Sequence, residues 1–186
     1  MEIAISQTYE VIILSTSQPI TCNQTLMVTT HRVFEPDLNE HQTVFGGKIL
    51  SLVDDSASVA AVRLTHATVV TAAFDHVNFL APFRLDDSLC LEAYVTGTGK
   101  RSLEVFVKVI GENLTTGKRF LGFTCFITYV LDNPDAPALP SIQPETDEQC
   151  YLCAGYQQRY QERRTHRDAE RELTQHLTLT APWLTD

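Results

Sequence analysis

The sequence has few basic residues for its length and no long apolar run. Its 186 residues include 14 Lys and Arg against 23 Asp and Glu, for a formal net charge of −9. This balance argues against general nucleic-acid binding, which needs a basic surface. No stretch approaches the roughly 18 consecutive apolar residues of a membrane helix. The apolar run Val11–Leu14 follows Glu2 and Glu10 instead of Lys or Arg, which is not typical of a signal peptide. We therefore expect a soluble cytoplasmic protein with no membrane or nucleic-acid partner.

Cysteine is scarce and odd in number. The five cysteines are Cys22, Cys90, Cys125, Cys150 and Cys153. An odd count in a chain of this length argues against a disulfide framework. Cys150 and Cys153 form a CxxC, but there is no second CxxC, and His166 and His176 are too far apart for the usual zinc pair. We expect two small residues at the start of a helix, with metal binding as the alternative, and no cofactor.

Three well-known motifs are also missing. No GxSxG is present, which excludes the serine-hydrolase elbow. The segment Gly111–Lys118 is one residue too long for a phosphate loop, and Arg119 stands where Ser or Thr is needed. Gly97-Thr98-Gly99 lacks the third glycine of a dinucleotide fingerprint. Any catalytic site must therefore use residues other than those of these three motifs.

A glycine pair followed by a long stretch without Gly or Pro predicts the central element, a helix from about Gly47 to Leu64. It is apolar or small on nearly every side, which is typical of a helix buried in a core. Asp54 breaks this pattern, because helical spacing places it on one face with Leu50, Ala57 and Ala61. Burial of a carboxylate is costly unless it is paired or used. Asp54 is therefore either a hydrogen-bonded structural residue or a functional one.

Gly46 and Gly47 stand where this helix begins. The first N–H groups of a helix have no internal partner and lie at the positive end of its dipole. Such amides can hold an oxyanion, and a carboxylate such as Asp54 can act as general base or nucleophile. The simpler alternative is that the two glycines only make a tight turn. Together with the polar loop that contains Asn39, the pattern favours acyl transfer or hydrolysis.

The rest of the chain predicts strands and then a charged helix. Strands are expected at about 26–34, 68–80, 88–96, 103–110 and 118–131, and the short turns between the last four predict antiparallel neighbours. Residues 1–22 are interpreted as an extension, 23–133 as the domain, and 134–186 as a Pro-rich linker with a C-terminal helix at about 145–177. Four arginines recur every fourth residue in that helix: Arg159, Arg163, Arg167 and Arg171. We expect a solvated stripe with weak ion pairs, with phosphate binding as the alternative.

These elements predict an α+β domain in which one sheet curls about one buried helix. The helix is too apolar for the face that points away from the sheet to be exposed to solvent, so a second subunit is expected to cover that face. The segments that carry a family resemblance are Asn39, Phe45–Leu50, Asp54–Asp55, Val69–Ala72, Val77–Pro82 and Thr98–Val109. In these segments, over residues 26–131, the chain resembles hotdog-fold acyl-CoA thioesterases of the small bacterial single-domain type.

The resemblance implies hydrolysis of acyl-CoA thioesters to a free carboxylic acid and coenzyme A. It implies a long central helix wrapped by an antiparallel sheet, and a homodimer that assembles further into a homohexamer, a trimer of dimers. Asp54 corresponds to the catalytic carboxylate, Asn39 to the residue that faces it from the partner subunit, and Gly46 and Gly47 to the oxyanion donors. The residues implied to bind the substrate are Asn78, Gly99, Lys100, Arg101 and Ser102. No metal and no cofactor beyond the coenzyme A of substrate and product is implied.

Some positions depart from the family pattern. Gln42 stands where Gly is usual, so the loop with Asn39 could follow another path. Lys100 replaces an Arg, which removes a bidentate phosphate contact. Two other functions stay open: a hotdog hydratase or dehydratase on hydroxyacyl-CoA, whose active loop Asp37–His41 only partly matches, and a non-catalytic acyl-CoA-binding module.

Overall fold

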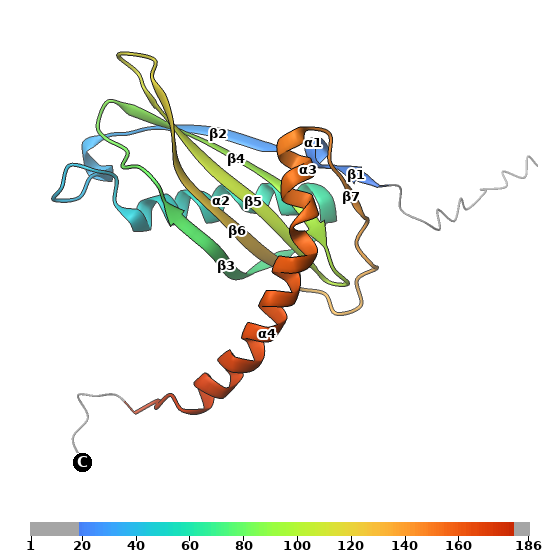
Figure 1. Ribbon diagram of the computed structural model, residues 1–186. Coiled ribbons are helices and arrows are strands. Elements are labelled where there is room, and N and C mark those ends of the chain that lie inside the picture. Colours follow the sequence, from blue (N-terminus) through green and yellow to red (C-terminus); the bar gives the residue numbers. More distant parts are fainter. Residues whose placement is uncertain (1–18, 181–186) are drawn as a thin grey trace, which may run out of the picture.

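The computed structural model describes residues 19–180, so most of the predicted extension 1–22 lies outside the described residues. Five strands form one sheet in the order β2-β4-β5-β6-β3, and every neighbouring pair is antiparallel (Figure 1). Their bounds are β2 Met27–Arg32, β3 Val69–Phe79, β4 Asp87–Thr98, β5 Ser102–Asn113 and β6 Arg119–Leu131. The predicted α+β hotdog arrangement is confirmed, because this sheet wraps one long helix, α2 (Gly46–Thr65).

The inner face of the sheet packs on α2 as the alternating pattern predicts. Side chains two residues apart point to the same face of a strand. The buried inner-face residues of β4, β5 and β6 are Leu89, Leu91, Ala93, Val95, Leu103, Val105, Val107, Val109, Phe123, Cys125, Ile127 and Tyr129. From α2 they meet Ile49, Val53, Ala57, Ala60, Ala61 and Leu64. Small residues on α2 bring helix and sheet close together, and this layer is the core.

The outer face of the sheet is covered by segments from both ends of the chain (Figure 1). The short strand β1 (Ile20–Thr21) pairs in parallel with β7 (Ile142–Gln143), which lies in the predicted linker. Thr21 caps the one-turn helix α1 (Cys22–Thr25). The C-terminal segment forms two helices instead of the single predicted one, α3 (Asp147–Ala154) and α4 (Tyr156–Gln175). The break falls at Gly155, and the Tyr156 ring packs over Gly97, where a Cβ atom would lie 2.2 Å from it.

The first half of the arginine stripe of α4, Arg159 and Arg163, is not a solvated face, so the expectation is wrong there, whereas Arg167 and Arg171 are exposed. Arg159 donates to both oxygens of Glu104, and Arg163 donates to one of them at 2.6 Å. Glu104 lies on the outer face of β5 and is 0% exposed. Thr96 donates a further hydrogen bond to the same carboxylate at 2.7 Å. Two turns of α4 are therefore held to the sheet by a buried ionic cluster, in which loss of one partner would leave a buried charge uncompensated.

Apolar side chains remain uncovered along one side of α2 and along the edge strand β3. Val59 and Val62 of α2 are 41% and 44% exposed, and Val70 and Phe79 of β3 are 48% and 54% exposed. Exposed apolar side chains beside an unpaired strand edge are typical of an interface between subunits. Among residues 19–180, no helix is long and apolar enough to span a membrane.

Candidate active site

Asp54 lies on α2, half-buried, with its carboxylate directed at β3. Thr71 Oγ1 donates a hydrogen bond of 2.8 Å to Asp54 Oδ1. The hydroxyl of the buried Tyr129 donates to the Asp54 backbone oxygen at 3.4 Å. The sequence analysis missed Thr71 as a functional residue, although it stands in a segment that carries the resemblance. The carboxylate is thus oriented by one hydroxyl and keeps its second oxygen available for chemistry.

The glycine pair forms the first turn of α2. Phe45 is the N-cap and provides no side-chain hydrogen bond to the helix. A Cβ atom on Gly47 would lie 2.8 Å from the Phe45 ring, so this position needs glycine in the present conformation. Backbone N–H groups in this first turn lack intrahelical acceptors and lie at the positive end of the dipole. The N–H groups of Gly46 and Gly47 are therefore free of intrahelical acceptors, and their role as oxyanion donors stays a prediction.

Asn39 belongs to a tight loop just before α2, closed by a bridge between Leu38 and Val44. Its side-chain oxygen accepts hydrogen bonds from the backbone N–H of His41 at 2.9 Å, and from the N–H and hydroxyl of Thr43 at 3.2 Å each. These three bonds fix the orientation of the amide. Its NH₂ group therefore points away from the loop acceptors and can donate to a substrate carbonyl or a water.

The backbone conformation of Gln42 shows how the loop accommodates this departure from the family pattern. Its φ is 58°, in the left-handed region that favours glycine, the residue usual at this position. The chain adopts this conformation with Gln42 all the same, so the loop does not need glycine in order to turn.

A buried carboxylate that the sequence analysis left unassigned anchors the same loop. Asp37 is 7% exposed, and its Oδ2 accepts from the Phe34 N–H at 2.9 Å and lies 2.8 Å from His31 Nε2. Lys48 Nζ is 3.5 Å from the other oxygen. Burial raises the pKa of Asp37, but the hydrogen bonds from Phe34 and His31 and the charges of His31 and Lys48 outweigh it and lower the pKa. The network ties β2, the loop and the start of α2 together.

The predicted substrate-binding residues lie at two ends of the sheet. The Gly99 N–H donates to the Ser102 carbonyl at 2.7 Å, which closes the turn that contains Lys100 and Arg101. Arg101 donates to the Leu131 carbonyl at 2.9 Å, while its buried Nε has no acceptor. Strand register places Ser102 opposite Val130, near the end of β6, but Asn78 opposite Thr124, which is closer to the start of β6. Asn78 donates to the His76 carbonyl within its own strand at 2.7 Å and does not join the turn.

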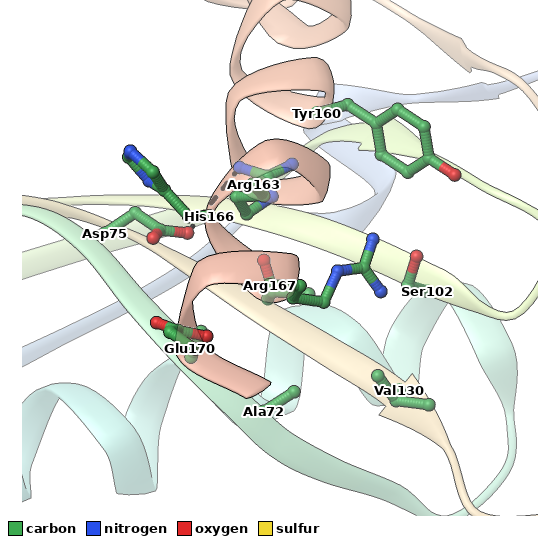
Figure 2. A pocket seen from close by; sticks show the side chains of 11 residues that line it. Ala72, Asp75, Ser102, Val130, Tyr160, Arg163, His166, Arg167 and Glu170 are labelled. Atoms are coloured by element: carbon green, nitrogen blue, oxygen red, sulfur yellow. Dashed lines mark ion pairs between the residues drawn. The ribbon is translucent and has the colours of Figure 1, made fainter. Parts of the chain in front are cut away.

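A cavity of about 260 Å³ lies between α4 and the outer face of the sheet, next to Ser102 (Figure 2). It is lined by Ala72, Ala73, Asp75, Ser102, Thr128, Val130, Tyr160, Arg163, His166, Arg167 and Glu170. Figure 2 shows the Arg167 guanidinium extending toward Ser102. Thr128 Oγ1 is buried without a hydrogen-bond partner, and Asp75 Oδ2, which also lacks a hydrogen bond, forms an ion pair with Arg163 at 3.6 Å. Since buried polar atoms are normally paired, this cavity is suited to a polar ligand. No three His, Cys, Asp or Glu side chains among residues 19–180 are grouped to hold a metal ion.

Comparison with known proteins places this geometry in a family. A family model described as Thioesterase superfamily matches residues 41–118. The uncharacterized acyl-CoA thioester hydrolase YkhA of Bacillus subtilis is 44% identical over 164 residues, which cover 87% of this chain and 95% of that protein. The chain therefore belongs to the acyl-CoA thioester hydrolases of the thioesterase superfamily, and the predicted hotdog fold and enzyme class are confirmed.

Two solved structures are similar over nearly their whole length. An apo-hexameric acyl-CoA thioesterase has a TM-score of 0.77 and 34% identity, with 81% of this chain and 97% of that chain covered. The acyl-CoA hydrolase of Staphylococcus aureus, solved with butyryl coenzyme A, coenzyme A and coenzyme A disulfide, has a TM-score of 0.79 and 28% identity, with 84% and 97% covered. Structures of that hydrolase with single alanine replacements exist for an Asp, an Asn and a Thr. These three positions have the spacing of Asp54, Asn39 and Thr71 in this chain.

Proposed function

We propose that the protein hydrolyses acyl-CoA thioesters to a carboxylic acid and coenzyme A in the cytoplasm, with Asp54 as the catalytic carboxylate. The proposed reaction needs no cofactor besides the coenzyme A of substrate and product. The observation that carries this assignment is the Asp54–Thr71 hydrogen bond of 2.8 Å on the helix whose first turn is formed by the glycine pair. A carboxylate and an oxyanion site on one helix are the parts that thioester hydrolysis needs.

The reaction follows from these groups. The N–H groups of Gly46 and Gly47 hold the thioester oxygen as it gains negative charge. Asp54 takes a proton from a water molecule whose oxygen attacks the carbonyl carbon, and the tetrahedral intermediate then expels coenzyme A as a thiolate, which takes up the proton. Direct attack by Asp54 would instead form a mixed anhydride that water opens. A single turnover in oxygen-18 water detects direct attack in which water opens the anhydride at the Asp54 carbonyl, because Asp54 then gains a solvent oxygen and the acid carries an enzyme oxygen.

The active site is completed by a second subunit in this proposal. The exposed valines of α2 and the open edge of β3 supply an apolar surface for the partner, and a hexameric relative supports assembly beyond the dimer. Asn39 is held by its own loop near the start of α2, with its amide NH₂ available. We place the partner's Asn39 opposite Asp54, where this NH₂ can orient the water or the thioester.

Replacement of Asp54 by Asn tests the assignment. We expect kcat for a panel of acyl-CoA substrates to fall by at least about 100-fold, since a general base contributes about 10²–10⁴. Asp55→Asn is the matched control, because Asp55 is exposed on the same helix and should leave kcat unchanged. Thiol release can be measured with a chromogenic disulfide. If Asp54→Asn keeps full turnover, or if no acyl-CoA is hydrolysed by the native protein, the proposal is wrong.

The cavity beside Ser102 is our candidate site for the phosphorylated nucleotide end of coenzyme A. Arg167 supplies a cation, and the unpartnered Thr128 hydroxyl can bond to a polar group of the nucleotide, while the Asp75 carboxylate is ion-paired with Arg163 at 3.6 Å. Arg167→Gln should raise KM for acyl-CoA about tenfold at unchanged kcat, because a charge-assisted hydrogen bond contributes about 1.5–3 kcal/mol. Acyl-pantetheine lacks the nucleotide, so its KM should not change. Arg164→Gln, on α4 but outside this cavity, is the control; equal KM values for both variants would contradict the placement.

A further inference from the structure

Two cysteines that are far apart in the sequence meet on the outer face of the sheet. The Sγ atoms of Cys22 and Cys153 are 3.6 Å apart, although 131 residues separate them. Cys22 is the first residue of α1 and is 0% exposed, whereas Cys153 lies on α3 and is half-buried. A disulfide needs an Sγ–Sγ distance of about 2.05 Å, so the sulfurs must approach by about 1.5 Å. Rotation of the two cysteine side chains about χ1 can supply such a movement.

Hydrogen bonds between neighbouring residues hold α1 and α3 in fixed positions beside each other. Gln149 donates to the Asn23 side chain at 2.8 Å, and the Asn23 N–H donates to Glu145 at 3.2 Å. On the other side of α3, Glu148 accepts from both Tyr94 and Lys108. The ends of α1 and α3 are thus fixed relative to each other by groups other than the thiols.

Cys153 is the more reactive of the two thiols. The hydrogen bond from Cys22 and the positive charge of Arg159 lower the pKa of Cys153, although burial opposes them. Arg159 is kept beside it by a hydrogen bond to the neighbouring Leu152 carbonyl at 2.7 Å. The same thiol contact and burial raise the pKa of Cys22. A half-buried thiol with a lowered pKa next to a fully buried thiol is the arrangement of an attacking and a resolving cysteine.

We propose that Cys22 and Cys153 form a reversible disulfide with low-molecular-weight disulfides as the oxidant, tying the C-terminal helices to the body of the domain. The Cys153 thiolate attacks one sulfur of the small disulfide, and one small thiolate leaves. The Cys22 thiol then gives up its proton and attacks the Cys153 sulfur of the mixed disulfide, which releases the second small thiol. The two protein thiols are oxidised, and one small disulfide is reduced to two thiols.

Oxidised glutathione and mass spectrometry of the full chain test this proposal. We expect the native protein to lose about 2 Da without gaining glutathione, and tryptic mapping to show a peptide that joins Cys22 to Cys153. Dithiothreitol should reverse the change. The thermal midpoint of the oxidised protein should exceed that of the reduced protein by about 5 °C, because a long loop is closed in the unfolded chain.

The third cysteine of this region provides the matched control. Cys150 is exposed on α3, three residues before Cys153, and Cys150→Ser should leave both the bond and the midpoint shift unchanged. Cys22→Ala should instead trap glutathione on Cys153, and Cys153→Ser should abolish both products. A bond between Cys150 and Cys153, or free Cys22 and Cys153 thiols after oxidation of the native protein, would overturn the proposal.

Discussion

The inner face of the sheet packs on α2 through apolar side chains, whereas the outer face packs on α3 and α4 around a buried carboxylate. Inner-face residues such as Val105 and Ile127 are 0% exposed and need no specific partner. Glu104, also 0% exposed, needs Arg159, Arg163 and Thr96 to satisfy its charge. Apolar burial tolerates any neighbour of suitable shape, while a buried charge requires particular partners. The two faces should therefore respond differently to mutation.

Removal of the buried carboxylate is expected to have the largest effect. Glu104→Ala removes the counter-charge of Arg159 and the nearer of the two carboxylates that Arg163 contacts, and should lower the free energy of unfolding by about 3–5 kcal/mol. On the inner face, Ile127→Ala leaves a cavity and should cost about 2–5 kcal/mol. Urea unfolding at one fixed protein concentration measures both values, since an oligomer's stability depends on concentration.

Apolar replacement of the whole cluster distinguishes the two faces. Glu104→Leu combined with Arg159→Met and Arg163→Met should recover most of the stability lost in Glu104→Ala, because an ion cluster can be exchanged for packed apolar groups. No equivalent second change rescues the Ile127→Ala cavity unless it refills the volume. If the triple variant is as unstable as Glu104→Ala, the cluster acts through shape and not through charge.

The same contrast explains what the sequence could predict. The apolar residues that alternate along β4 and β5 are buried on the inner face, and so are those of β6 from Phe123 to Tyr129. The stretch after Gly47 predicted α2. Both patterns are visible in the sequence because apolar burial leaves a periodic pattern. Leu121 shows the limit of the pattern: it shares the alternation of β6 but is 45% exposed near the strand's start. The Glu104 cluster and the Cys22–Cys153 contact leave no such pattern, since they join residues that are distant along the chain.

The candidate site divides in a similar way. Asp54 was identified because a carboxylate on an apolar helix is out of place, and the structure adds Thr71 as its hydrogen-bond donor. Asp37 was missed because an acidic residue in a polar loop is ordinary in sequence, and only the fold brings His31 and Lys48 to it. The pairing of Asp54 with the partner's Asn39 stays a prediction that the activity of mixed oligomers can test.

Asp37 is a second buried carboxylate, on the active-site side of the molecule. We expect its loss to destabilise the protein less than the loss of Glu104. Asp37→Asn should lower the free energy of unfolding by about 1–2 kcal/mol at neutral pH, because charge-assisted hydrogen bonds are lost. The folded-state pKa of Asp37 is lowered. Its contribution is therefore complete above the unfolded-state pKa and is lost as the pH falls through the folded-state pKa. The difference in the free energy of unfolding between the native protein and Asp37→Asn should therefore shrink as the pH falls through the folded-state pKa of Asp37; a difference that stays constant in acid would show that Asp37 acts by packing alone.

The smallest expected effect concerns backbone conformation, which neither face of the sheet determines. Gln42 has φ 58°, and a non-glycine residue in this region costs about 1–2 kcal/mol, while glycine costs about 0.5–1 kcal/mol of chain entropy. Gln42→Gly should therefore raise the free energy of unfolding by about 0.5 kcal/mol and leave kcat unchanged, since Asn39 keeps its hydrogen bonds. Glu40→Gly, in the same loop but without a positive φ, should lower it by a similar amount. Thermal melts of the two variants, measured side by side, decide between these outcomes. Equal destabilisation by both variants would mean that the Gln42 side chain makes a stabilising contribution larger than the backbone strain.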